Sequence, residues 1–579
     1  MQRSWSFYRA AFQRYLRPHI KKIVSLGLLL LLSSAVALAP AQILRLYIDA
    51  AQQKNMLSIL VLIAACYLGC VIVSMLINVG IAYLSEQISW SATNRLRTEL
   101  MQHCLNLDMS FHNEHTPGAL IERIDGDVSL LANFFSQLIL QVVNNVILLL
   151  GMLLLLMLTD WRLGVAFGCF ALLALIAMSK VRNLAIPHWK LARQASAQFF
   201  GFLEERLTGR EDIRSSAATE YVLKQFSTLM QKSYRLERKA AALGSILGAT
   251  TVICFTIGYG VAFALGAFLY HNGAITLGGV YLLYQYMLLL EKPVQQITTQ
   301  LDDLQMASAG LSRTRELLQT TSLLSDHGQG SLPPGPLAVT FRTVSFGYHA
   351  HQNTLNSVSF HLEAGQVLAV IGRTGSGKST LARLLLRLYD PTAGEILLGD
   401  TPLTHLPLAQ IRESVGLVTQ DIQFFHASVR DNLTFFNRAI SDATILDVLT
   451  QLGLSDWLQG LSAGLDTILQ GSQGLSSGEA QLLAFTRVFL KNPQIVVMDE
   501  ASSHLDPVTE QKIERAIDSL LQNRTGIIIA HRRATIARAQ HIIVLKEGQI
   551  NEMGTRRELQ QQDSYVARLF ASLQEEITA

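Results

Sequence analysis

The residues best suited to chemistry form one short glycine-rich run, GRTGSGKST, from Gly372 to Thr380. The run follows the apolar stretch QVLAVI and precedes a helical stretch, which is where a phosphate-binding loop is found. Its glycines let backbone N–H groups approach phosphate oxygens without a Cβ in the way, and the start of the helix adds partial positive charge. The nucleotide contacts expected in this loop are Gly372, Gly375, Ser376, Gly377, Lys378, Ser379 and Thr380.

Two side chains of the loop have separate expected roles. Lys378 can reach the β and γ phosphates as a mobile point charge, and the Ser379 hydroxyl suits the coordination of Mg²⁺. The loop therefore predicts a nucleotide with β and γ phosphates, together with Mg²⁺, as ligands.

Two acidic residues and a histidine end further apolar stretches of the same region. QIVVMDE ends in Asp499, which is expected to hold the Mg²⁺ shell, and Glu500, which could polarise an attacking water as a general base. His531 ends the stretch IIIAH, and a side chain at the carboxyl edge of a parallel sheet faces the same crevice as the phosphate loop. We expect His531 to contact the γ phosphate; a purely structural histidine is the alternative.

The stretches that position these residues alternate between strand and helix. From Ala338 onward, apolar β-rich runs are separated by helical runs, and the strands are apolar enough to be buried on both faces. The pattern predicts an α/β fold around a largely parallel sheet over residues 338–579. A Gly- and Pro-rich linker over residues 324–337 is expected to precede it.

The first half of the chain is predicted to lie in a membrane. The sequence is 50% hydrophobic and only 16% charged, and six apolar runs approach the length of a helix that spans a bilayer. The runs are residues 23–43, 59–81, 138–158, 163–178, 243–270 and 275–294. We expect an all-α transmembrane domain over residues 23–323, whose six helices extend far into the cytoplasm.

The positions of the charges predict the orientation. The segment 1–22 and the long loops between spans are rich in Arg and Lys, which places both on the cytoplasmic side. We therefore expect a multi-pass protein of the plasma (inner) membrane, with the N-terminus and residues 338–579 in the cytoplasm. A cleaved signal peptide is the alternative for the first run, but that run is too long for a signal core and more runs follow.

Charge and cysteine content exclude other classes of partner. A net charge of +3 provides no dense basic face, so no nucleic-acid partner is expected. The five cysteines are widely spaced, which predicts neither a zinc site nor a disulfide framework.

Further motifs stand in a familiar order: FGY at Tyr348, LVTQD at Gln420, LSSGE at Leu475 to Glu479, and SSHLD at Asp506. Together with the phosphate loop, the acidic pair and His531, they make the second half resemble the nucleotide-binding domain of ATP-binding-cassette (ABC) transporters. The first half resembles the exporter-type membrane domain more loosely, through the stretch 111–128, DWRL at residues 160–163, and Pro293.

The resemblance implies roles for these further residues. Tyr348 would stack on adenine, Gln420 would link Mg²⁺ to the membrane domain, and Asp506 would lie in the loop that crosses a dimer interface. LSSGE would be the signature, in which the Ser476 hydroxyl and the Gly478 backbone approach a γ phosphate. Asp499 and Glu500 would be the metal and catalytic carboxylates, and His531 the switch histidine.

The family also implies a dimer, because each ATP lies between the phosphate loop of one nucleotide domain and the signature of the other. A chain with one phosphate loop and six spans resembles a half-transporter, whose partner is a second half-transporter. LSSGE departs from the usual signature at Ser477 and Glu479, whereas Lys378, Asp499 and Glu500 are kept. This combination favours a heterodimer in which LSSGE touches the ATP of the partner; a homodimer with a working LSSGE is the alternative.

The expected function is ATP-driven export of small hydrophobic or amphipathic compounds, or of membrane lipid, by alternating access. Uptake through the same fold, as in some siderophore transporters, and a regulatory subunit with low turnover are the alternatives. Candidates for contact with the substrate are the polar side chains within the spans: Asn144, Asn145, Tyr281, Tyr284, Glu291 and Lys292. Helix packing or a position near the membrane boundary explains them equally well.

Overall fold

The computed structural model describes residues 14–15, 17–53, 56–137, 142–349, 352–471, 474–499, 507–530, 533–561 and 565–568. The chain divides into two compact units. A helical unit comprises Met1–Leu105 and Pro117–Thr320, and a sheet unit comprises Asn106–Thr116 and Thr321–Ala579. The segment Asn106–Thr116, which we expected within the transmembrane domain, thus belongs with the sheet. Most of the basic segment 1–22 lies outside the described residues.

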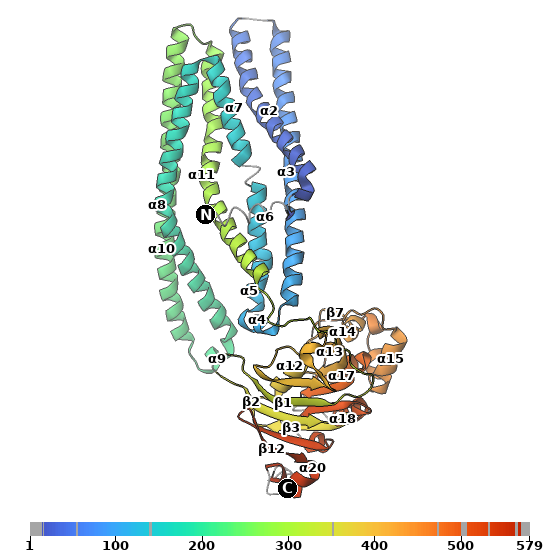
Figure 1. The fold of residues 1–579 in the computed structure, drawn as a ribbon. Coiled ribbons are helices and arrows are strands. Elements are labelled where there is room, and N and C mark those ends of the chain that lie inside the picture. The colour runs from blue at the N-terminus through green and yellow to red at the C-terminus, as the bar shows by residue number, and fades with distance from the viewer. Residues whose placement is uncertain are drawn as a thin grey trace. The chain divides into compact units, whose positions relative to one another are not determined.

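Long helices make up the helical unit (Figure 1). In chain order they are η2 (Arg17–His19), α2 (Ile20–Gln52), α3 (Leu57–Asn106), α5 (Pro117–Ile121), η3 (Glu122–Gly126), α6 (Asp127–Gln137), α7 (Asn144–Thr159), α8 (Trp161–Thr208), α9 (Arg210–Ser215), α10 (Thr219–His271) and α11 (Leu277–Gln319). Among the described residues, four helical stretches are long and apolar enough to cross a membrane. They are Arg17–Gln52, Leu57–Asn106, Trp161–Thr208 and Thr219–His271.

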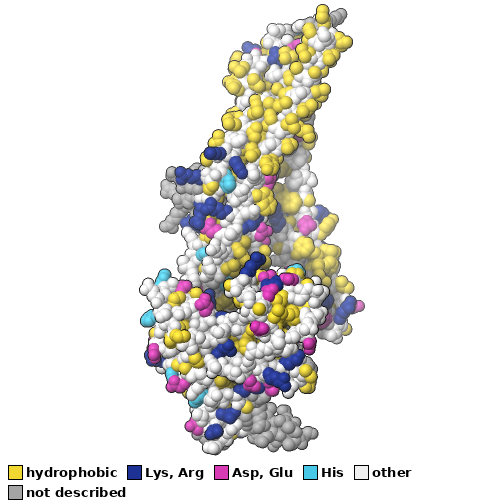
Figure 2. All heavy atoms as spheres, turned by 90° about the vertical axis from the view of Figure 1, so that its right-hand side faces the viewer, with side chains coloured by type: hydrophobic (Ala, Val, Ile, Leu, Met, Phe, Trp, Pro, Cys, Tyr) yellow, Lys and Arg dark blue, Asp and Glu magenta, His cyan; other side chains and the backbone are white. Residues whose placement is uncertain are grey.

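The other two expected spans are less complete. The span 138–158 begins in residues outside the described part, and its described portion is the apolar helix α7, which has 16 residues. The span 275–294 lies in α11, a helix of 43 residues that is not among the four. Large apolar side chains remain exposed along α3 and α10, including Leu62, Leu68 and Ile257. Figure 2 shows hydrophobic side chains spread over this unit, as expected of a surface that faces lipid.

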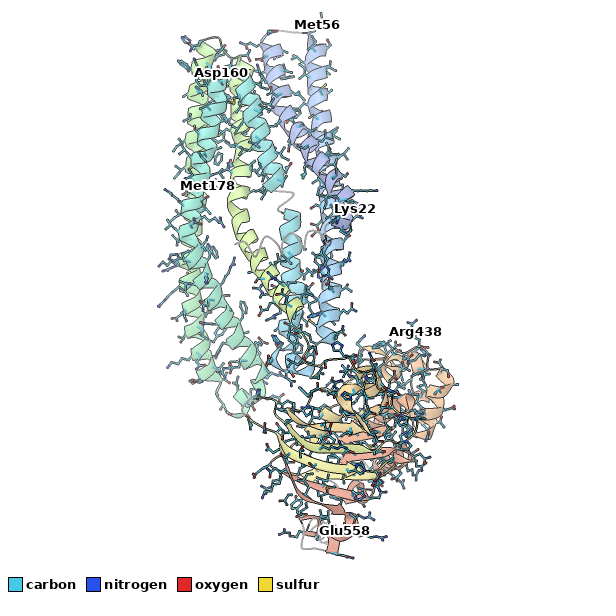
Figure 3. All side chains as sticks on the ribbon, in the orientation of Figure 1. Lys22, Met56, Asp160, Met178, Arg438 and Glu558 are labelled. Atoms are coloured by element: carbon cyan, nitrogen blue, oxygen red, sulfur yellow. The ribbon has the colours of Figure 1, made fainter. Side chains whose placement is uncertain are left out.

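Polar side chains cap the helices that follow two short connections. Asp160 ends α7 and caps α8, because its side chain accepts the Arg162 N–H at 2.8 Å. Thr276 caps α11 in the same way through the Gly279 N–H, and Asp49 of α2 accepts the Gly278 N–H at 2.9 Å. In Figure 3, Met56 and Asp160 lie towards one end of the helices and Lys22 lies well away from it. Met56, just before α3, and Asp160, between α7 and α8, therefore lie at the same end of the unit.

The helical unit has its own core. α8 and α10 pack along much of their length, and α7 and α11 pack against them (Figure 1). Met152, Leu156, Phe167, Phe255 and Tyr286 are almost completely buried between these helices. Fully burying a large apolar side chain stabilises a fold by about 1.5–3 kcal/mol when the side chain would otherwise be exposed to water. The stabilisation is smaller when the side chain would otherwise be exposed to lipid.

The described residues of the sheet unit form three sheets. Its strands are β1 (Val339–Phe346), β2 (Leu355–Leu362), β3 (Val367–Gly372), β4 (Ala393–Leu398), β5 (Thr401–Pro402), β6 (Val415–Val418), β7 (Ala427–Ser428), β8 (Ile468–Leu469), β9 (Ile495–Asp499), β10 (Thr525–Ile529), β11 (His541–Lys546) and β12 (Gln549–Thr555). The central sheet has the order β12-β11-β3-β10-β9-β6, and all its pairs are parallel except β11 with β12. This confirms the predicted α/β fold.

A second sheet, β2-β1-β4-β5, is antiparallel and was not predicted. The third is the short pair β7-β8. The helices of the unit are α4 (Met109–Glu114), α12 (Lys378–Leu385), η5 (Leu403–His405), α13 (Leu408–Ser414), α14 (Val429–Thr434), α15 (Asp442–Gln451), α16 (Ser455–Gln459), η6 (Gly464–Asp466), α17 (Ser477–Lys491), α18 (Pro507–Leu521), α19 (Arg533–Ile536) and α20 (Arg556–Gln561).

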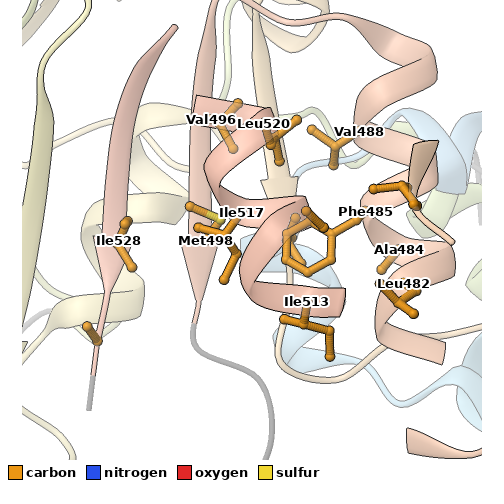
Figure 4. Close-up of a cluster of buried hydrophobic side chains, with 14 of the residues drawn as sticks. Leu482, Ala484, Phe485, Val488, Val496, Met498, Ile513, Ile517, Leu520 and Ile528 are labelled. Atoms are coloured by element: carbon orange, nitrogen blue, oxygen red, sulfur yellow. The ribbon is translucent and has the colours of Figure 1, made fainter. Parts of the chain in front are cut away.

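The two faces of the central sheet contribute to two separate cores. On β3, Ala369 and Ile371 join one cluster, whereas Leu368 and Val370 join the other. The alternation follows from the period of two along a strand. Figure 4 shows the first cluster, in which Phe485 of α17 packs among residues of β9 and α18. This packing fixes α17 against the strand that ends in Asp499.

Candidate functional site

The carboxyl ends of four parallel strands meet at one edge of the central sheet. β3, β10, β9 and β6 are neighbours, and Ile529 of β10 pairs with both Val370 of β3 and Asp499 of β9. The phosphate loop follows β3, Asp499 ends β9, and Gln420 lies shortly after β6. The sheet therefore brings the loop, Asp499 and Gln420 to one edge.

The phosphate loop needs glycine at specific positions. Gly375 and Gly377 have φ of 83° and 101°, a region that side chains rarely adopt. A Cβ on Gly377 would lie 2.6 Å from Cδ2 of Leu355, and one on Gly372 would lie 2.3 Å from the Leu545 carbonyl oxygen. Leu355 and Leu545 thus pack closely against the loop at Gly377 and Gly372, and neither position has room for a side chain.

Lys378, the first residue of α12, is held inside the loop. Its Nζ donates to the carbonyl oxygens of Gly372 at 2.8 Å and Arg373 at 3.0 Å, and only 7% of the residue is exposed. These bonds hold the ammonium group against the backbone of the loop that would bind phosphate oxygens.

Two further observations fit a bound nucleotide. The Ser376 Oγ is buried and has no hydrogen-bond partner within the described structure. The start of α12 has no side-chain cap, so its first N–H groups point out of the helix unsatisfied by a cap. The Ser376 hydroxyl, the N–H groups at the start of α12 and the Lys378 ammonium group could all bind the oxygens of a triphosphate. The residues present therefore fit ATP.

Oxygen donors for Mg²⁺ lie along the same edge. The Ser379 hydroxyl follows β3, the Asp499 carboxylate ends β9, and the Gln420 amide oxygen follows β6, which is the neighbour of β9. Mg²⁺ prefers such oxygen ligands and would neutralise charge on the phosphates. Ser379 and Asp499 are partly buried and Gln420 is exposed.

Tyr348 lies beside a pocket of about 460 Å³. Its ring packs edge-on against Phe346 and Tyr389, at centroid distances of 5.0 and 5.3 Å. Its hydroxyl accepts a hydrogen bond from Arg383 at 2.9 Å and lies 3.2 Å from the Thr380 hydroxyl of the phosphate loop. The Tyr348 ring is therefore fixed next to the loop, as a stacking position for a base requires.

Three residues that shape this pocket were not predicted from the sequence. Arg383 of α12 fixes the Tyr348 hydroxyl, and Tyr389 packs on the Tyr348 ring. Asn113 of α4 donates to the Tyr389 hydroxyl at 2.6 Å. Burial raises the pKa of Tyr389. Asn113 precedes the tyrosine by 276 residues, a separation that no local pattern bridges.

The segment that carries Asn113 is anchored by Asp108. Its carboxylate caps α4 by accepting the N–H groups of Ser110 and Phe111 at 2.9 and 3.2 Å. It also accepts from the Ser322 hydroxyl and the Leu323 N–H. Burial acts to raise the pKa of Asp108, but the hydrogen bonds outweigh it and lower the pKa. The segment is thus tied to the start of the linker.

The signature LSSGE forms the start of α17. Ser476 is the N-cap, and it forms a reciprocal capping box with Glu479. The Ser476 Oγ accepts the Glu479 N–H at 3.2 Å, and the Glu479 carboxylate accepts the Ser476 N–H at 2.8 Å. Ser476 and Ser477 are exposed, whereas Gly478 is buried. The carboxylate of Glu479 is therefore held against the helix N-terminus.

Arg487 connects the signature helix to the loop that follows Gln420. Its guanidinium donates to the carbonyl oxygens of Gln423 and Asn432, both at 2.9 Å. It also lies over the rings of Phe424 and Phe435, at 4.4 and 4.8 Å from their centroids. Burial lowers the pKa of Arg487 to about 10. The sequence did not indicate this residue, because its partners lie more than 50 residues away.

Three predicted site residues, Glu500, Asp506 and His531, lie outside the described residues. Their roles stay predictions. Their neighbours in the chain are described. Glu500 directly follows the end of β9 at Asp499, Asp506 directly precedes α18, which begins at Pro507, and His531 is two residues after the end of β10 at Ile529.

The asparagine pair in the helical unit bridges helices. Asn145 donates to Gln296 of α11 at 2.7 Å, and Asn144 accepts from Ser34 of α2 at 3.0 Å. Of the two interpretations given above for this pair, the structure supports helix packing.

A parallel sheet with a phosphate loop at its carboxyl edge, attached to a unit of apolar membrane helices, defines a membrane protein driven by nucleotide hydrolysis. Two family models match the chain. One, described as the ABC transporter transmembrane region, matches residues 23–294, and the other, described as ABC transporter, matches residues 355–503.

Similar proteins agree with these matches. The chain is 29% identical over 586 residues to an ATP-dependent lipid A-core flippase of Chromobacterium violaceum, covering 98% of this chain and 97% of that protein. It is 28% identical over 501 residues to a multidrug resistance ABC transporter ATP-binding and permease protein of Lactococcus lactis subsp. lactis, covering 86% of this chain and 84% of that protein. A solved bacterial Atm1-family ABC exporter with ATP bound has the same fold, with a TM-score of 0.79, 24% identity, and coverage of 96% of this chain and 98% of that one.

The chain belongs to the ABC transporter family: it is a half-transporter of the exporter type, and its ATPase domain is coupled to transport across a membrane.

Proposed function

We propose that the chain is one subunit of a dimeric exporter that moves hydrophobic or amphipathic compounds, or lipid, out of the cytoplasm at the expense of ATP. The main support for the proposal is the phosphate loop, in which the buried Lys378 ammonium group and the Ser376 hydroxyl, which has no partner among the described residues, could bind an anion. Relatives named as a lipid A-core flippase and a multidrug resistance transporter support the class of substrate.

The proposed chemistry assigns one task to each group at the sheet edge. Lys378 and the loop backbone hold the phosphates, and Tyr348 stacks on the base. Ser379, Gln420 and Asp499 would hold Mg²⁺, which supplies neutralisation of phosphate charge. Glu500 would take the proton of the attacking water, and His531 would contact the γ phosphate. Asp506 would lie in the loop that faces the other nucleotide domain.

The partner we favour is a different half-transporter. The support is the signature, where Glu479 places a carboxylate on the N–H of Ser476, a group that would otherwise be free to bind phosphate. A partner with the usual signature would complete the site formed by the Lys378 loop, and LSSGE would complete the site of the partner. The two sites would then hydrolyse ATP at different rates.

The proposed location is the plasma (inner) membrane, with the sheet unit in the cytoplasm. The basic residues of the long loops support this orientation. The start of α3 near Met56 and the connection at Asp160 would then face the opposite side.

The subunit composition can be tested directly. The chain is tagged at one terminus, purified from its own cells in mild detergent, and weighed intact by mass spectrometry. We expect one copy of this chain with one copy of a second half-transporter. A complex of twice 63.9 kDa that contains this chain alone would contradict the heterodimer and would mean two equal sites completed by LSSGE.

A further inference from the structure

The segment that follows α11 is hydrogen-bonded to the rest of the sheet unit. It comprises residues 321–337, most of which the sequence predicted as a linker, and we call it the strap. The Asp326 carboxylate of the strap accepts the Leu408 N–H at 2.9 Å. The Gly330 N–H donates to the His405 carbonyl oxygen, also at 2.9 Å. The strap therefore lies along the segment that contains η5 and the start of α13.

Glycine allows the strap to approach this segment closely. A Cβ on Gly328 would clash with the Leu406 backbone, and a Cβ on Gly330 would lie 3.0 Å from the His405 carbonyl oxygen. Both positions thus bring backbone into contact with backbone. A segment packed in this way shifts together with the residues on which it lies.

Arg387 bonds to the strap and to the same segment at once. Only 1% of its side chain is exposed. Its Nη2 donates to the Ser325 carbonyl oxygen of the strap at 3.0 Å. Its Nη1 donates to the carbonyl oxygens of Leu403 and Leu406, at 3.2 and 3.4 Å. Its Nε donates to the Asp390 carboxylate at 2.9 Å, which balances the charge. One guanidinium therefore holds the strap against the segment on which it packs.

The backbone position of Arg387 is one that glycine usually occupies. α12 ends at Leu385 with a Schellman motif, in which the Leu388 N–H donates to the Arg383 carbonyl oxygen at 3.0 Å. Arg387 takes the left-handed position of this motif, with a φ of 47°, which is unfavourable for a residue that has a Cβ. The turn alone would favour glycine, so the contacts of the guanidinium account for an arginine at this position.

α12 connects Arg387 to the phosphate loop. Lys378 is the first residue of this helix, and Arg387 stands two residues after its last residue, Leu385. The helix has eight residues, which is about 12 Å, and six of them are buried. A short and largely buried helix is displaced as a unit, because a close-packed interior leaves it little room to bend. A shift of the phosphate loop on nucleotide binding would therefore move Arg387.

We propose that Arg387 is a positioning residue that transmits nucleotide binding from the phosphate loop, through α12 and the strap, to the last membrane helix. The strap continues directly from α11, which ends at Gln319, so the chain itself passes a shift of the strap to this helix. Arg387 acts through α12 and the strap, not by contact with the nucleotide. The inference goes beyond the proposed function, because it depends on no particular substrate.

Hydrogen exchange of the purified full complex tests this role. Exchange is followed with and without Mg²⁺ and the non-hydrolysable analogue AMP-PNP in the phosphate loop, in the strap, and at the end of α11 over residues 309–320. In the wild type, AMP-PNP should slow exchange in all three segments. Arg387→Lys keeps a cation beside Asp390 but lacks the planar fork that reaches the strap. In this variant the slowing should persist in the phosphate loop and be lost in the strap and in α11.

Two further variants complete the comparison. Arg387→Met should behave as Arg387→Lys does. Both should bind AMP-PNP within about twofold of the wild type, because the substitution is remote from the loop. Arg412→Met, which changes an exposed arginine of α13, is the matched control and should exchange as the wild type does.

The proposal is overturned if AMP-PNP does not slow exchange in the strap of the wild type, or if both Arg387 variants keep that slowing. Loss of AMP-PNP binding by a correctly folded Arg387→Lys would also overturn it, since Arg387 would then serve the nucleotide site itself. A normal elution profile separates lost transmission from a lost fold, and Arg387→Lys decides the test if Arg387→Met does not fold. A complex that shows the slowing but exports nothing would contradict the proposed function alone.

Discussion

Replacing Glu479 with glutamine should strengthen the binding of ATP at the signature and leave helix α17 in place. The amide oxygen of glutamine can still accept the Ser476 N–H, which the carboxylate accepts at 2.8 Å. The second bond of the capping box, from the Glu479 N–H to the Ser476 Oγ, does not involve the side chain at position 479. The variant therefore removes one charge and keeps the cap.

The size of the effect follows from the geometry of the cap. A phosphate held by the same helix N-terminus would lie about 6 Å from the carboxylate, because each hydrogen bond spans about 3 Å. At that separation, and at an effective dielectric constant of about 40, two unit charges repel by about 1.4 kcal/mol, which is a factor of ten in binding. The variant also loses a favourable charge at the helix N-terminus, which lowers stability by about 0.3–1 kcal/mol.

The assay is the ATP dependence of hydrolysis by the purified complex with its partner. Glu479→Gln should lower the KM for ATP about tenfold. Glu479→Asp, which retains the charge, is the matched control and should leave the KM near that of the wild type. An unchanged or raised KM in Glu479→Gln would refute the reasoning, since it would mean that the carboxylate does not oppose phosphate.

Three further changes have expected outcomes. Lys378→Ala should abolish ATP hydrolysis and weaken ATP binding at least tenfold, because each hydrogen bond to a charged group contributes about 1.5–3 kcal/mol. Normal ATP hydrolysis by this variant would contradict the assignment of the loop. Gly377→Ala places a Cβ 2.6 Å from the Leu355 side chain at a backbone φ of 101°. We expect this variant to lose about 1–3 kcal/mol of folding stability, measured by thermal unfolding, and to lose ATP binding, measured with a fluorescent nucleotide. Full ATP binding would show that the loop tolerates a side chain. Arg313→Met removes the guanidinium that donates to both carboxylate oxygens of Asp127, a side chain that is 1% exposed. Thermal aggregation of the variant in detergent should therefore begin at a lower temperature, and Arg313→Lys should restore part of the loss. Equal stability of Arg313→Met and the wild type would show that the pair contributes little.

The phosphate loop could be predicted from the sequence because all of its parts are contiguous. Glycines, lysine and the flanking strand and helix lie within a short run, and the structure places them as the pattern indicates. The common position of Gln420 and Asp499 was also predictable, because parallel strands bring their carboxyl ends to one edge of a sheet.

Contacts between distant segments could not be predicted. Asn113 meets Tyr389 across 276 residues, and the segment that carries Asn113 joins the sheet unit although the pattern around it is that of the membrane helices. The antiparallel sheet was missed because β1 and β4 pair across two intervening strands, β2 and β3, and helix α12.

The capping box at the signature is a different kind of omission. Ser476 and Glu479 have the spacing of a capping box, so the signal was present in the sequence. From the sequence, Glu479 was treated only as a departure from the usual signature. The structure shows that the same side chain also has a local partner, the Ser476 N–H.

The direction and energy source of transport can be measured in one experiment. Inverted membrane vesicles from cells that express the complex are given fluorescent hydrophobic dyes and a fluorescent phospholipid, and accumulation is followed on addition of ATP. Export from the cytoplasm predicts ATP-dependent accumulation inside the vesicles by the wild type and none by Lys378→Ala. Accumulation that is independent of ATP, or ATP-driven movement out of the vesicles, would contradict the account.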